Sequence, residues 1–151
     1  MKRVFLLCSL AALSACSSLP GQSDAERLAM FRKNAGAPVR DFRLFGSLNG
    51  WQPLGNSALA VWTRPNEAYL LDLTGPCPDL DYAPAISISS MMNQVSTFDR
   101  VMPVGGGAAG MRIPCHIRTI RPLDVKALKA AQAELRKAEV VAREAEAKDR
   151  P

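Results

Sequence analysis

Four cysteines and one histidine are the residues of this sequence with the most distinctive chemistry. The cysteines are Cys8, Cys16, Cys77 and Cys115, and the histidine is His116. A cysteine can carry a lipid, form a disulfide, bind a metal or act as a nucleophile, and its surroundings decide which. The chain of 151 residues is long enough for one folded domain, and its 48% hydrophobic and 22% charged residues are typical of globular proteins.

Residues 1–15 have the layout of a secretory signal peptide. Lys2 and Arg3 form a positive start, and the segment from Val4 to Leu13 is apolar except for Ser9. An apolar run of about ten residues is too short to cross a bilayer as a helix, which takes about 20. A cleaved signal therefore explains this segment better than a membrane span, and Cys8 leaves with it.

The segment Leu13-Ser14-Ala15-Cys16 resembles the lipobox of bacterial lipoproteins, in which a branched residue and two small residues precede a cysteine. The resemblance implies cleavage before Cys16, an S-diacylglycerol on its thiol and an N-acyl chain on its new amino group. One acyl chain binds a membrane marginally, whereas two or three hold a protein there. Lipoproteins that are retained in the inner membrane have Asp directly after the lipidated cysteine. This chain has Ser17 there, which implies transport to the periplasmic face of the outer membrane. The alternative is secretion to the periplasm without lipid, with Cys16 incidental.

Cys77 and Cys115 then remain as a pair in the folded part of the chain. In an oxidising periplasm such a pair favours a disulfide, which would stabilise the fold by about 4 kcal/mol by chain-entropy arguments. A zinc site would need more ligands than His116 adds. A Cys115–His116 catalytic pair is the other alternative, but neighbours on a strand point to opposite faces. We predict the disulfide.

Other candidates for chemistry are weaker. His116 is the only histidine, so a Ser–His–Asp triad would have to use it, with Asp99 as the orienting acid, and no nucleophile elbow is present. Asp79, Asp81 and Asp99 are a candidate carboxylate cluster, but turn acids of this kind more often cap backbone N–H groups. The "GGGAAG" run at 105–110 lacks the Lys-Ser/Thr of a phosphate loop. We predict no enzyme, no cofactor and no metal, with an enzyme based on His116 as the last alternative.

Every cationic side chain between residues 37 and 122 is an arginine: Arg40, Arg43, Arg64, Arg100, Arg112, Arg118 and Arg121. The guanidinium group suits bidentate contacts with carboxylates or phosphates. Salt bridges are the expected role, with partners among Asp41, Asp72, Asp81 and Asp99. The alternative is a site for a small anionic ligand or a lipid headgroup at the mouth of the β domain, contacted by Arg43, Arg100, Arg112 and Arg118. Loss of Lys2 and Arg3 with the signal lowers the formal net charge from +5 to +3, and nucleic acid is not an expected partner of an exported protein.

The elements that must position these residues fall into three segments. Residues 16–38 are predicted to be a lipidated tether and a short helix that docks weakly on the domain or acts as a spacer. Ser23 and Glu26 have capping-box spacing, and the helix should end near Asn34.

Residues 39–122 are predicted to be a disulfide-closed β domain. Six short runs have strand composition: "DFRLFGS", "ALAVWT", "AYLLDL", "AISIS", "VSTFDRV" and "MRIPCHIRTI". The fold class is therefore mainly β, a small antiparallel barrel or sandwich of about six strands. The expected inward-facing side chains are Leu59, Val61, Leu71, Leu73, Ile86, Ile88 and Ile117.

Residues 123–151 are predicted to be a long helix rich in Ala, Glu, Lys and Arg, with Asp124 as its N-cap. A narrow apolar stripe runs along it: Val125, Leu128, Leu135, Ala138 and Ala142. Its first half can pack on the β domain and its second half is expected in solvent. A monomer is expected, with dimerisation through a coiled coil of this helix as the alternative, because alanine buries little area.

The middle of the chain, residues 42–124, resembles a family of small uncharacterised bacterial cell-envelope lipoproteins. The pattern is a first hairpin with a tryptophan, a Tyr-Leu strand before a Cys segment, a Phe-Asp pair and a late Cys-x-Ile. It falls here on Trp51, Leu59, Tyr69, Leu70, Cys77, Leu80, Phe98, Asp99, Cys115, Ile117, Ile120, Pro122 and Asp124. The resemblance implies an envelope location and supports the Cys77–Cys115 pair, and it implies no activity.

These features together favour an outer-membrane-anchored periplasmic lipoprotein. We expect a non-enzymatic adaptor or structural factor, held by the lipid on Cys16, with an envelope protein as a partner. A binding module for a small anionic ligand is the second expectation.

Overall fold

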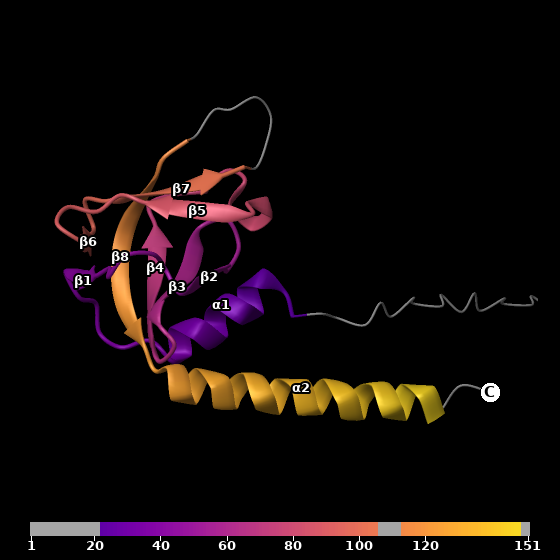
Figure 1. Cartoon of the computed structure of the whole chain (residues 1–151). Helices are drawn as coiled ribbons and strands as arrows, with labels where there is room; N and C mark the ends of the chain where they lie inside the picture. The colour runs from indigo at the N-terminus through magenta and orange to yellow at the C-terminus, as the bar shows by residue number, and fades with distance from the viewer. Residues whose placement is uncertain (1–21, 106–112, 149–151) are drawn as a thin grey trace, which may run out of the picture.

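The computed structural model describes residues 22–105 and 113–148. In order along the chain, their elements are α1 (Asp24–Lys33), β1 (Asp41–Arg43), β2 (Gly50–Pro53), β3 (Ala58–Arg64), β4 (Glu67–Leu73), the 3-10 turn η1 (Leu80–Tyr82), β5 (Ala85–Ile88), β6 (Gln94–Ser96), β7 (Arg100–Val104), β8 (Cys115–Leu123) and α2 (Val125–Lys148). The mainly β class with a short first helix and a long last helix is confirmed (Figure 1).

The described strands form two antiparallel sheets. One has six strands in the order β2-β3-β4-β8-β7-β5, and the other pairs β1 with β6. Because β2 and β5 are edges of the large sheet, it is not closed, and the fold is sandwich-like rather than a barrel. The six predicted runs become eight strands. The run "VSTFDRV" divides around a turn into β6 and β7, and β2 lies outside the six predicted runs.

The inner face of the large sheet carries the main hydrophobic core. Five of the predicted inward-facing residues are buried there, namely Leu59, Val61, Leu71, Leu73 and Ile117, while Ile86 and Ile88 are half-buried against it. The small β1–β6 sheet adds Phe42 and Val95 to the same core. Alternation along β3, β4 and β8 therefore places one apolar set inward, as the period of two requires.

The outer face of the same sheet is covered by α1. Three small side chains, Ala58, Ala60 and Ala68, are buried on this face and let the helix come close. Phe31 of α1 is 0% exposed and meets Trp62 edge to face, with ring centroids 6.4 Å apart. The expectation of a weakly docked helix is wrong, because Phe31 makes α1 part of a second hydrophobic core.

The two helices begin as the sequence predicts. Ser23 and Glu26 form the capping box of α1, and Asn34 is its C-cap. The Asp124 carboxylate accepts a hydrogen bond from the Ala127 N–H (2.9 Å) at the start of α2. Val125 and Leu128 are buried, whereas the side chains from Glu134 to Lys148 are exposed, and α2 extends past the β domain in Figure 1. Within residues 22–105 and 113–148, no helix has the length and apolar character to cross a membrane.

Candidate functional site

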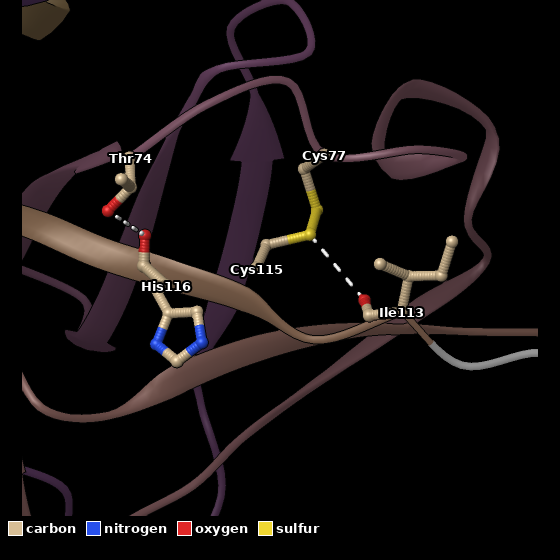
Figure 2. Close-up of a disulfide and its surroundings, with 5 residues drawn as sticks. All are labelled: Thr74, Cys77, Ile113, Cys115 and His116. Carbon is tan, nitrogen blue, oxygen red and sulfur yellow. Dashed lines mark hydrogen bonds between the residues drawn. A yellow bond between two sulfur atoms is a disulfide. The ribbon is translucent and has the colours of Figure 1, made fainter.

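Cys77 and Cys115 form a disulfide, so the predicted pair is confirmed. Cys77 follows β4, Cys115 begins β8, and their Cα atoms are 5.5 Å apart across a sequence separation of 38 residues. Both side chains lie in the main core (Figure 2). As a disulfide, neither sulfur is a thiolate, so this pair offers no nucleophile or metal ligand.

His116 points away from the disulfide, as Figure 2 shows. Cys115 is buried and His116 is exposed, in agreement with the expected alternation on β8. The backbone carbonyl of His116 accepts hydrogen bonds from the Thr74 N–H (2.9 Å) and the Thr74 hydroxyl (3.3 Å). The backbone of His116 thus joins β8 to the turn after β4, while its ring lies on the outer surface.

The Asp99 carboxylate stabilises the turn between β6 and β7 by accepting hydrogen bonds. These come from the Ser89 hydroxyl (2.7 Å), the Ser96 N–H (2.8 Å) and the Ser96 hydroxyl (2.9 Å). Partial burial raises the pKa of Asp99, but these hydrogen bonds outweigh it and leave the pKa below its usual value. The carboxylate faces serines that fix the Ser96–Asp99 turn rather than the His116 ring, so the candidate triad is not assembled.

The three candidate acids do not come together. Asp79 precedes η1 in a left-handed conformation with φ 61°, and Asp81 lies in η1. Burial and the nearby Asp24 carboxylate raise the pKa of Asp81. Among the described residues, no group of three or more His, Cys, Asp or Glu side chains has the arrangement of a metal site.

Of the "GGGAAG" run only Gly105 is described, and Arg112 also lies outside the described residues.

The arginines pair differently from the expected pattern. In the described part of the β domain, Arg64 pairs with Glu67 (3.0 Å), and no ion pair joins the other arginines there to the four predicted acids. The partner of Asp72 is Arg32 of α1. Arg43 lies opposite Gln94 in the small sheet, whereas Arg100 of β7 lies opposite His116 of β8. The structure therefore brings Arg100 near His116 and Arg118 and leaves Arg43 elsewhere.

A polar network under α1 was missed by sequence reasoning. The Asp72 carboxylate accepts hydrogen bonds from the Arg32 guanidinium (2.8 Å) and the Thr119 hydroxyl (2.8 Å), and Asp72 is 4% exposed. Burial raises the pKa of Asp72, but the hydrogen bonds from Arg32 and Thr119 and the charge of Arg121 bring it below its usual value. The one available signal was a single acid inside the apolar run "YLLDL".

Open grooves lie beside the helices rather than at the predicted arginine site. One of about 420 Å³ between α1 and α2 is lined by Gln22, Arg27, Met30, Gln52, Gln132, Leu135, Arg136 and Glu139. Another of about 310 Å³ lies between α1 and the β2–β3 turn, with Asp24 and Asp81 at its wall. Both are open to solvent, and neither is lined by Arg43, Arg100 or Arg118.

Comparison with known proteins gives a single match. A family described as "Family of unknown function (DUF6491)" matches residues 1–139. No curated protein and no solved structure matches the chain. The match covers α1, the whole β domain and the first part of α2.

Proposed function

The chain belongs to the DUF6491 family, a family of unknown function, and from that premise we propose that it is a non-enzymatic lipoprotein of the cell envelope. In this proposal the lipid on Cys16 anchors the protein at the periplasmic face of the outer membrane. The folded part then acts there as an adaptor or structural factor for an envelope protein.

The observation that carries the proposal is the locked position of α1. This helix begins at Asp24, a few residues after the lipobox, and Phe31 and the Arg32–Asp72 ion pair fix it to the sheet. Any force on a lipid at Cys16 would therefore act directly on the folded body. A helix that served only as a spacer would not need a fully buried phenylalanine and a buried ion-pair partner.

Three further observations support the proposal. The Cys77–Cys115 disulfide fits an oxidising compartment such as the periplasm. The candidate catalytic groups are used structurally, since Asp99 holds a turn and both folded-domain cysteines are in the disulfide. Residues 134–148 of α2 are exposed and extend past the folded body, so in this proposal they are the surface that binds the partner.

Mass spectrometry of the mature N-terminus tests the anchor. We expect the protein from membranes to begin at Cys16 with the added mass of two or three acyl chains. Cys16→Ser should release it from the membrane fraction, whereas Cys8→Ser in the same signal should leave lipidation intact. An unmodified residue at position 16, or membrane retention of the Cys16→Ser protein, would overturn the anchor.

Cross-linking in intact cells tests the adaptor role. A photo-reactive residue at Val141, which is exposed on α2, should capture a defined envelope protein. The same residue at Thr74, which is exposed in the turn after β4, serves as the matched control. If Val141 captures nothing, or the same products as Thr74, α2 is not the adaptor arm.

A further inference from the structure

Neither helix covers the outer side of the sheet at the start of β8. We call the exposed surface there the bare edge, although it lies mostly on the inner strands β7 and β8, and define it as Phe98, Arg100, His116 and Arg118. Arg100 and His116 are directly opposite each other on β7 and β8. Arg118 is two residues along β8, and the exposure pattern places it on the same side as His116. The Ile117 N–H donates to the Asp99 carbonyl (3.2 Å), which ties the Phe98 turn to this end of β8.

Phe98 is presented in a fixed position. It is 91% exposed, yet it sits in the turn that the Asp99 carboxylate holds with three hydrogen bonds. The Phe98 N–H also donates to the Ser96 hydroxyl (3.3 Å). An exposed aromatic side chain on a rigid turn loses little conformational freedom on binding, which is the usual form of an anchor residue at an interface.

The cations of the bare edge are available to an external anion. Arg100, His116 and Arg118 are all exposed, and in the described residues none of them forms an ion pair. The nearest acid, Asp99, already has its oxygens occupied by Ser89 and Ser96. The charge of Arg100 helps to lower the pKa of Asp99, but in the described part of the chain neither Arg100 nor Arg118 is held in an ion pair.

We propose that the bare edge is a membrane-contact site, at which Phe98 enters the interface of an anionic phospholipid bilayer while Arg100 and Arg118 bind headgroup phosphates. An exposed phenylalanine on a turn next to exposed arginines matches a lipid surface, which has no pocket but accepts an apolar side chain anywhere. The inference rests on the proposed lipid anchor, because the stretch from Cys16 to Ser23 spans at most about 28 Å and keeps the domain near the bilayer. The contact would fix the orientation of the domain on the membrane.

Vesicle sedimentation of the unlipidated mature chain, residues 17–151, tests this site separately from the anchor. The buried core residues of the described segments lie between Phe31 and Leu128, and this chain contains all of them. We expect binding to vesicles with phosphatidylglycerol and much weaker binding to pure phosphatidylcholine. The double change Arg100→Gln/Arg118→Gln should weaken binding by about 30-fold, since one cation near an anionic surface contributes about fivefold. Phe98→Ser should weaken it by about tenfold.

Matched controls are available on the same molecule. Tyr82→Ser removes an aromatic side chain that is 86% exposed on η1, and Arg136→Gln/Arg143→Gln removes two exposed cations from α2. Both controls should leave vesicle binding within twofold. An equal loss in the arginine control would mean binding by net charge alone, and an equal loss in the Tyr82 control would mean binding through any exposed aromatic side chain. Either result would overturn the site.

Other results also decide the question. Absence of binding to phosphatidylglycerol vesicles by the unmodified chain would overturn the membrane contact even if Cys16 is lipidated. Full competition by millimolar glycerol phosphate would identify a small-anion site and overturn a bilayer contact. If vesicle binding follows the expected pattern but Cys16 carries no lipid, the bare edge stands and the anchor fails.

Discussion

The two ends of strand β8 have opposite relations to their surroundings on the outer sheet face. At the Thr119–Leu123 end, α1 and α2 cover the sheet and the buried Asp72 has both a charged and a hydroxyl partner. At the Cys115–Arg118 end, the disulfide lies beneath the sheet while Arg100, His116 and Arg118 are exposed above it. The first end is therefore packed on both sides of the sheet, whereas the second is packed on its inner side and exposed on its outer side.

Removal of the disulfide should have the largest effect on stability. Cys77→Ala/Cys115→Ala should lower the free energy of unfolding by about 4 kcal/mol, because the unfolded chain regains the freedom of a loop that joins residues 38 apart. Urea unfolding of the oxidised and reduced protein measures the difference. Reduction of the unmodified protein should give the same loss, and a loss below about 1 kcal/mol would show that the inner side of this end is held by packing alone.

A pair of phenylalanines compares the two ends directly. Phe31→Ala, at the covered end, should cost about 3 kcal/mol, because it empties a fully buried site between α1 and the sheet. Phe98→Ala, at the bare edge, should change the free energy of unfolding by less than about 0.5 kcal/mol. Equal effects in urea unfolding would contradict the division into a structural end and an open end.

The same comparison explains what the sequence predicted. The strand runs, the caps at Ser23 and Asp124, and the Cys77–Cys115 pair follow from local composition or from elimination among four cysteines. The role of Asp72 did not follow, because its partner Arg32 is 40 residues away on a helix whose docking depends on three small alanines. Hydrophobic periodicity and strand propensity identify which face of a strand is apolar, but they do not identify which element covers that face.

For the described residues, the prediction that the arginines of the β domain pair with Asp41, Asp72, Asp81 and Asp99 was wrong for a related physical reason. An ion pair needs its partners within about 4 Å, and that distance depends on strand register rather than on composition. Antiparallel register places Arg100 opposite His116 instead of an acid, and an extra residue in β8 places Arg118 at a bulge opposite the Asp72–Leu73 step. Among the described residues, the ion pairs of Arg64 and Asp72 are made with Glu67 and Arg32, which were not among the predicted partners.

The network around Asp72 should make the covered end sensitive to acid. The folded-state pKa of Asp72 lies below its unfolded value of about 3.9, so its contribution is fully present at neutral pH and disappears as pH falls through the folded pKa. Asp72→Asn should cost about 2 kcal/mol at pH 7, because a charged hydrogen bond is lost. The difference between the two proteins should shrink as the pH falls below the unfolded pKa and through the folded one. Urea unfolding at pH 7, 5 and 3 gives this profile, and a constant difference at all three would assign the effect to packing.

The smallest expected effect on stability belongs to the proposed contact residues. Arg100→Gln/Arg118→Gln should shift the free energy of unfolding by less than about 0.5 kcal/mol, because neither guanidinium has a charged partner among the described residues. Arg32→Gln, the matched change at the covered end, should cost about 1 kcal/mol or more, because it leaves the buried Asp72 carboxylate without its cation. Urea midpoints of the two variants measure this contrast. A loss above about 1 kcal/mol for the double variant would show that the bare edge serves the fold, and the same loss would then explain any change in vesicle binding. If the double variant is as stable as expected but binds vesicles more weakly, Arg100 and Arg118 contribute to membrane binding and not to the stability of the fold.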